Sequence, residues 1–176
     1  MSNAETGIPA DKGVLYQATT PRIYLALWRR LRKVSDSDAV IDVGCGKGRM
    51  LKYFSRFSFG RVDGLEYSEV LGEIARRNME RLNLKCEIYI HDAAKFNGYC
   101  AYNYFYLFNP FPEGVLREFL NRLKESVIEC PSHAKLTIFY MNCPYIEVLK
   151  EEGFSMISLG KGIERGLAVF EYKKEV

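Results

Sequence analysis

Apolar residues follow two alternating patterns along the chain. Residues 39–43 form a short apolar run that ends in glycines, which is typical of a buried parallel strand. Residues 21–34 repeat apolar residues every three or four positions, which predicts an amphipathic helix. The same patterns predict further helices at 49–57, 69–82, 114–130 and 145–152, and further strands at 61–67, 85–90, 102–108, 136–141, 156–159 and 167–172.

The order of these elements predicts the fold class. Strands and helices alternate until the last two strands, which follow one another across a short turn that contains glycine. Alternation predicts a parallel sheet with helices on both faces, and the final pair predicts a hairpin that adds one antiparallel strand. We therefore expect an α/β fold with three layers. We expect a single domain over residues 21–176, preceded by an N-terminal segment, residues 1–20, that is suited to form a lid.

Composition narrows the setting but not the function. The 176 residues are 48% hydrophobic and 27% charged, as in an ordinary globular protein, and the net charge of +3 is too small to indicate nucleic acid by itself. The five cysteines contain no CxxC pair, so we predict neither a metal site nor a disulfide framework. No apolar run is long enough for a membrane span and no signal peptide is visible, so we expect a cytoplasmic protein with reduced thiols.

A glycine loop follows the first predicted strand. Gly44, Gly46 and Gly48 stand at alternate positions between that strand and the next helix, where they let backbone N–H groups approach a ligand closely. Open α/β sheets bind ligands at such strand ends. A dinucleotide fingerprint needs a third glycine at the sixth position, which here is Arg49. This departure disfavours a nicotinamide-dependent oxidoreductase, which stays open as an alternative.

The stretch Asp42-Val-Gly-Cys-Gly-Lys-Gly48 resembles the D-x-G-x-G-x-G loop of class I S-adenosylmethionine-dependent methyltransferases. The resemblance implies a Rossmann-like sheet of seven strands, mostly parallel, with a C-terminal antiparallel hairpin, and S-adenosylmethionine as the cofactor. Glu66 lies 24 residues after Asp42, where the family carries the carboxylate that binds the ribose. The residues that the resemblance assigns to the cofactor are Asp42, Gly44, Cys45, Gly46, Gly48, Glu66, Tyr67, Asp92, Ala93 and Asn109.

Several of these residues also have a purely structural interpretation. Asp42 is suited to accept hydrogen bonds from loop amides, and Asp92 to cap a helix. Cys45 is interpreted as a small filler between glycines rather than as a redox group. These alternatives stay open at the level of the sequence.

The segment after the fourth predicted strand, Asn109-Pro-Phe-Pro112, partly resembles the Asn-Pro-Pro-Tyr motif of amino-methylating enzymes. The resemblance implies that Asn109 is catalytic, accepting a hydrogen bond from a target nitrogen, and that Pro110 and Phe111 contact the acceptor. Half of the motif differs, so its nucleic-acid substrate is not carried over. Tyr16 in the N-terminal segment and Tyr140 after the fifth strand are further candidates for acceptor contacts.

The sequence therefore predicts methyl transfer from S-adenosylmethionine to an unidentified acceptor, with nitrogen slightly favoured. One alternative is a non-catalytic S-adenosylmethionine-binding module or subunit. Basic clusters at 29–33 and 76–81 permit a nucleic-acid partner but support it weakly. No membrane partner is expected, and the sequence does not indicate an oligomeric state.

Overall fold

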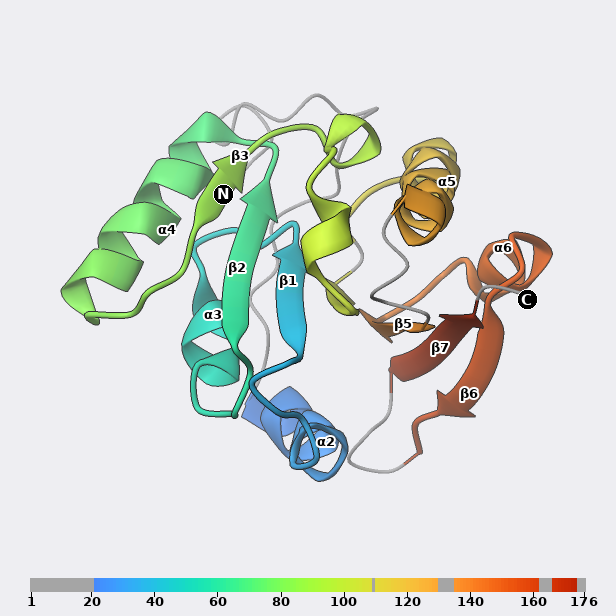
Figure 1. The fold of residues 1–176 in the computed structure, drawn as a ribbon, viewed down its shortest axis with the longest axis horizontal. Coiled ribbons are helices and arrows are strands. Elements are labelled where there is room, and N and C mark those ends of the chain that lie inside the picture. The colour runs from blue at the N-terminus through green and yellow to red at the C-terminus, as the bar shows by residue number, and fades with distance from the viewer. Residues whose placement is uncertain (1–20, 109, 130–134, 162–165, 174–176) are drawn as a thin grey trace.

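The computed structural model describes residues 21–108, 110–129, 135–161 and 166–173. Its centre is a seven-stranded sheet in the order β3-β2-β1-β4-β5-β7-β6 (Figure 1). β7 is antiparallel to both of its neighbours, and the other strand pairs are parallel, which confirms the predicted fold. The strands are β1 (Ala39–Val43), β2 (Arg61–Glu66), β3 (Ile88–Ile90), β4 (Tyr104–Phe108), β5 (Lys135–Met141), β6 (Ser155–Leu159) and β7 (Leu167–Lys173).

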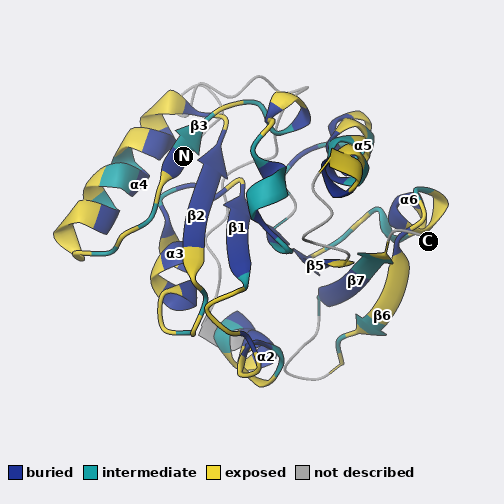
Figure 2. Cartoon of the chain, viewed as in Figure 1, coloured by how far each residue is buried: buried dark blue, intermediate teal, exposed yellow. Residues whose placement is uncertain are grey.

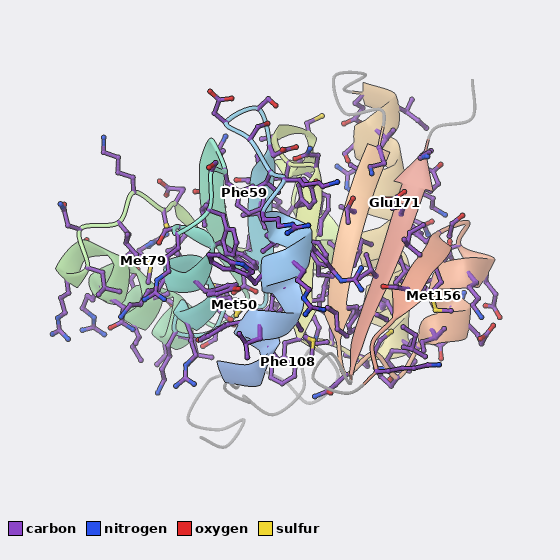
Figure 3. The ribbon with its side chains drawn as sticks, turned by 90° about the horizontal axis from the view of Figure 1, so that it is seen from below. Met50, Phe59, Met79, Phe108, Met156 and Glu171 are labelled. Carbon is purple, nitrogen blue, oxygen red and sulfur yellow. The ribbon has the colours of Figure 1, made fainter. Side chains whose placement is uncertain are left out.

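Helices cover both faces of the sheet. α2 (Pro21–Leu31), α3 (Arg49–Phe54) and α4 (Glu69–Arg81) pack on one face, which Figure 3 views from the side of α2. α5 (Glu113–Glu129) and α6 (Ile146–Glu151) pack on the other face, together with the short 3-10 turns η1 (Ala93–Lys95) and η2 (Tyr99–Ala101). The molecule is thus built in three layers.

The central strand β1 serves two hydrophobic cores at once. Successive side chains of a strand point to opposite faces, so Val40 packs under α2 and α3 while Ile41 packs under α5. All five residues of β1 are buried, as the dark strand in Figure 2 shows. Burial on both faces explains why this strand is apolar at every position except Asp42.

Two predicted strands are shorter in the structure, and in both a side chain takes over backbone hydrogen bonding. Strand 85–90 begins only at Ile88, because the backbone N–H of Glu87 donates to the Asp63 carboxylate at 2.7 Å. Strand 102–108 begins at Tyr104, because the Asn103 side-chain oxygen accepts from the Ala39 N–H at 2.9 Å. The two 3-10 turns were not predicted, since three residues carry no usable periodicity.

The cysteine prediction was wrong at one position. Cys100 takes part in a disulfide bond, whereas Cys45, Cys86 and Cys143 are free thiols. Spacing along a sequence does not show which cysteines meet in space, so this bond left no pattern to recognise. Separately, none of the helices among the described residues combines the length and the apolar character needed to cross a membrane.

Candidate functional site

The carboxyl ends of β2, β1 and β4 lie side by side at one edge of the sheet. Val43, at the end of β1, is in register with Leu65 of β2 on one side and Leu107 of β4 on the other. The glycine loop leaves β1 at this edge, and the chain reverses its direction of winding between β1 and β4. Such a switch point is where open α/β sheets bind their ligands.

Backbone hydrogen bonds fix the start of the glycine loop against β2. The N–H groups of Gly44 and Cys45 both donate to the carbonyl of Leu65, at 2.8 and 3.0 Å. Gly44 is exposed and has a φ of 81°, in the left-handed region that side chains disfavour. A Cβ added to Gly44 would lie 2.8 Å from the Cβ of Pro110, closer than atoms of neighbouring residues pack. Both the backbone angle and the proximity of Pro110 therefore require glycine.

Glu66 joins the glycine loop to the start of α4. Its buried carboxylate accepts from the N–H of Gly46 at 2.8 Å and from the N–H of Ser68 at 2.9 Å. Burial raises the pKa of Glu66, and the backbone donors Ser68, Gly46 and Tyr67 lower it by less. Each carboxylate oxygen can accept more than one hydrogen bond, so this group can also receive hydroxyl groups of a ligand.

Asp42 is a second buried carboxylate beside Glu66. It is 3% exposed, and no described residue donates a hydrogen bond to it. Burial, followed by the negative charge of Glu66, raises the pKa of Asp42 well above its ordinary value. The interpretation of Asp42 as a cap for loop amides has no counterpart among the described contacts. Two buried carboxylates with so few donors favour a ligand that carries positive charge.

Cys45 has a packing role in this loop. Its side chain is buried, and burial raises the pKa of its thiol, with Asp42 adding to the effect. A Cβ added to Gly64 on β2 would lie 2.7 Å from the Cys45 sulfur, so the thiol occupies the space left by that glycine. A buried thiol with a raised pKa is a poor nucleophile, in agreement with the filler interpretation.

The end of β3 extends the same edge. The N–H of His91 donates to the carbonyl of Glu66 at 3.0 Å, which ties β3 to the end of β2. The Asp92 carboxylate accepts from the N–H of Ala94 at 2.9 Å and caps η1. The capping interpretation of Asp92 is thus observed, and Ala93 lies beside it with its carbonyl accepting from the Tyr99 hydroxyl at 2.8 Å. Tyr67 is exposed at the end of β2.

The candidate residues for acceptor contacts are arranged differently. Asn109 and Tyr16 lie outside the described residues. Phe111 is 5% exposed and packs against Phe119 with 5.6 Å between ring centroids, so its ring fills the core and presents no face for stacking on an acceptor. The expectation that Phe111 stacks on an acceptor is therefore corrected. Tyr140 is fully buried and so presents no surface to an acceptor, which corrects the expectation of an acceptor contact there; among the described residues its hydroxyl has no hydrogen-bond partner.

One contact that supports the site was missed at the level of the sequence. The side-chain amide of Asn78, on α4, donates to the carbonyl of Lys47 at 3.0 Å and holds the end of the glycine loop. The two residues are 31 positions apart, and asparagine in a helix gives no indication of such a role. Ser68 also supports the site by capping α4, since its hydroxyl oxygen accepts from the N–H of Leu71 at 3.2 Å.

Comparison with known proteins agrees with this geometry. A family model described as "Methyltransferase domain" matches residues 40–126, which include the glycine loop and Glu66. The chain belongs to the class I S-adenosylmethionine-dependent methyltransferases. The curated relative "EEF1A lysine methyltransferase 2" of Danio rerio is 22% identical over 77 residues, which are 41% of this chain. The match spans 33% of that relative, about a third of its length.

Solved structures of other methyltransferases share the fold. The 16S rRNA N2 methyltransferase of T. thermophilus, solved with AdoMet and guanosine, has a TM-score of 0.65 at 19% identity and covers 93% of this chain and 45% of its own. The ribosomal protein L11 methylase of Lactobacillus delbrueckii subsp. bulgaricus has a TM-score of 0.63 at 16% identity. The match covers 93% of this chain and 82% of that methylase. At these identities the likeness concerns the fold.

S-adenosylmethionine is the cofactor of this family, and the site suits it chemically. Its sulfonium and amino groups carry positive charge, which the two buried carboxylates of Asp42 and Glu66 complement. Its ribose presents two adjacent hydroxyls, which one carboxylate can accept together. The exposed backbone at Gly44 leaves room for close approach of a ligand.

Proposed function

We propose that this methyltransferase transfers the methyl group of S-adenosylmethionine to a nitrogen acceptor. The observation that carries the cofactor part of the proposal is Glu66, whose carboxylate holds Gly46 of the loop and Ser68 of α4 while keeping acceptor capacity. A carboxylate held in this way is already oriented for two ribose hydroxyls, so little rearrangement is needed on binding. The nitrogen part rests on Asn109.

The cofactor would lie across the ends of β1, β2 and β3. Asp42, Gly44 and Gly46 would hold its amino-acid portion, with Cys45 and Gly48 shaping the loop. Glu66 would hold the ribose, with Tyr67 beside it. Asp92 and Ala93 would meet the adenine, because a carboxylate accepts from the exocyclic amine and its capping bond to Ala94 fixes its direction.

The acceptor would approach from the end of β4. The cofactor supplies a methyl group on a sulfonium, which is electrophilic without further activation. What the chain must provide is position and orientation, and we assign this to Asn109, whose side-chain oxygen would accept from the target nitrogen and aim its lone pair. Asn109 would also border the cofactor. Pro110 and Tyr16 would line the acceptor side, with residues 1–20 closing over the domain at 21–176 as a lid.

Two relatives support nitrogen as the acceptor atom but differ in its carrier. One is named a lysine methyltransferase and the other an rRNA N2 methyltransferase, so both names specify nitrogen. One acceptor is protein and the other is RNA. Other solved structures with the same fold are named O-methyltransferases, so the nitrogen proposal rests on Asn109 together with these two names.

Calorimetry followed by a transfer assay tests the proposal. S-adenosylhomocysteine is expected to bind to the purified chain and NADH is not; tight NADH binding without S-adenosylhomocysteine binding would indicate the oxidoreductase instead. Transfer of labelled methyl from S-adenosylmethionine is then measured on pools of amine metabolites, lysine peptides and RNA. Asn109→Ala is expected to abolish transfer and leave cofactor affinity nearly unchanged, whereas the control Asn121→Ala, on the exposed face of α5, keeps both. Cofactor binding without transfer to any pool would indicate a non-catalytic binding module.

A further inference from the structure

Two neighbouring helices carry a surface that the proposed function does not use. We call it the α2–α3 surface and define it by Trp28, Arg29, Arg32, Lys52 and Arg56, all of which are exposed. Trp28 and Arg29 lie on α2, and Arg32 follows the end of that helix, four residues after Trp28. Lys52 lies on α3, and Arg56 follows the end of that helix, four residues after Lys52. Figure 3 shows α2 and α3 side by side on the same face of the molecule.

Aromatic contacts hold the two helices together along this surface. Tyr24 of α2 stacks on Tyr53 of α3 with 4.3 Å between ring centroids. Further along α2, the ring centroid of Trp28 lies 5.3 Å from that of Phe57, which follows α3. Trp28 nevertheless remains 55% exposed, so its indole is anchored at one edge and open at the other. A fixed, exposed indole is a suitable platform for stacking a planar ligand.

Within the described part of the chain, no carboxylate forms a salt bridge with a cation of the α2–α3 surface. Residues 21–57 contain nine lysines and arginines but only three aspartates. Asp42 is buried in the site, and Asp38 accepts from Asn103 at 2.7 Å. Among the described residues no salt bridge is formed by the four cations that define the surface, or by Lys33 beside them.

On the opposite face of the sheet, several cations form salt bridges. Arg117, Arg122, Lys124 and Lys150, on α5 and α6, each form a salt bridge with a glutamate. Residues 21–57 therefore hold a local excess of positive charge, whereas these cations of α5 and α6 are neutralised by neighbouring glutamates. A localised excess of unpaired arginine and lysine attracts a polyanion.

We propose that the α2–α3 surface binds single-stranded nucleic acid, with phosphates on its cations and an unpaired base stacked on Trp28. Proteins that bind single strands without sequence preference combine cations that contact the phosphate backbone with exposed aromatic rings on which bases stack. The surface is separate from the strand-end site, because α3 begins at the glycine loop and leads away from it to Phe57. The proposal is therefore independent of the assigned cofactor residues.

An anionic membrane fits the surface less well. A helix that lies in a membrane interface presents a broad apolar face to the lipid. The broad apolar face of α2 is instead buried in the protein core through Ile23, Ala26, Leu27 and Leu31. Its exposed face offers Leu25 and Trp28 as large apolar groups, interrupted by arginines.

Trp28 provides the readout, because it is the sole tryptophan of the sequence. Titration with a mixed-sequence single-stranded RNA of about twelve nucleotides is expected to quench its fluorescence to saturation. If the four cations of the surface contact phosphates, log Kd plotted against log salt concentration should rise with a slope of about 3. Failure of the RNA to quench Trp28 or to bind at low salt would overturn the proposal.

Charge-matched variants locate the contact. Arg32→Glu with Arg56→Glu is expected to weaken RNA binding, followed by anisotropy of labelled RNA, by more than about tenfold. Lys135→Glu with Lys150→Glu makes the same change in net charge at exposed cations elsewhere on the protein, and should change affinity less than twofold. Trp28→Ala should weaken binding about tenfold through lost stacking. Equal losses in both charge pairs would show that net charge alone is responsible, and would overturn the proposal.

Two controls separate this proposal from its alternatives. Affinity for S-adenosylhomocysteine and the melting temperature are expected to be unchanged in the Arg32/Arg56 variant, so failure of RNA binding leaves the methyltransferase assignment standing. Anionic vesicles of phosphatidylserine and phosphatidylcholine, and a polyglutamate peptide, are offered as competitors. Displacement of RNA by either competitor at equal charge concentration would contradict a nucleic-acid surface.

Discussion

The two halves of the strand-end edge are built in different ways. At the ends of β1, β2 and β3, backbone N–H groups and buried carboxylates hold one another, with Glu66 bonded to Gly46 and Ser68. At the ends of β4 and β5, the described aromatic side chains turn into the core, as Phe111 and Tyr140 do. The first half depends on backbone geometry within short segments, so sequence motifs predict it. The second half depends on side chains from segments that are far apart in the sequence, so sequence motifs predict little of it.

The largest expected effect concerns Glu66, which holds the first half together. Glu66→Ala removes two charge-assisted hydrogen bonds to the loop and the acceptor for the ribose. Since each such bond contributes about 1.5–3 kcal/mol, affinity for S-adenosylhomocysteine should fall more than about a hundredfold in calorimetry. Glu69→Ala, at an exposed position three residues away, should change nothing. An unaltered affinity in Glu66→Ala would remove the ribose assignment.

The next largest effect tests the contact between the two halves, which Gly44 makes with Pro110. Gly44→Ala imposes a left-handed backbone on alanine and presses its Cβ against Pro110. We expect a loss of about 2 kcal/mol in the free energy of unfolding, measured in urea, together with weaker cofactor binding. The matched control is Gly114→Ala in the first turn of α5, where nothing lies within 4 Å of the added Cβ. That variant should gain up to about 1 kcal/mol, and equal stability of the two would contradict the contact.

A third prediction concerns the pH dependence of the ligand-free site. Because burial raises the pKa of Asp42, the folded state binds its proton more readily than the unfolded state does. Stability is therefore lost as pH rises from the ordinary aspartate pKa, about 4, through the raised one. Asp42→Asn removes this loss, so its free energy of unfolding, measured in urea, should exceed that of the wild type increasingly as pH rises, by on the order of 1 kcal/mol. Asp36→Asn, at an exposed position, should show no such divergence.

The smallest effect lies in the second half. Tyr140→Phe removes a buried hydroxyl that has no partner among the described residues, so the free energy of unfolding should stay the same or rise by up to about 1 kcal/mol. A stability loss above about 1 kcal/mol would show that the hydroxyl is bonded in solution. Tyr145→Phe, at a half-buried position in the following loop, is the control.

The sequence predicted the fold and half of the site for identifiable reasons. β1 is buried on both faces and so appears as a run that is apolar except for Asp42, and the spacing from Asp42 to Glu66 follows from one strand, one helix and the next strand. The bond between Asn78 and Lys47 could not be predicted, because it joins segments that meet only in the folded chain. Phe111 was misplaced because an aromatic residue after a strand has the same pattern whether it faces a ligand or packs on Phe119.

The contact between Gly44 and Pro110 bears on how this enzyme can be redesigned. A new acceptor pocket is most simply made by exchanging the segment that follows β4 for one from another methyltransferase. Pro110 lies against the glycine loop, so a bulkier or displaced residue there would disturb the cofactor as well. The exchangeable segment should therefore begin after Pro110, and that proline should be retained together with Gly44 as an invariant pair of the scaffold.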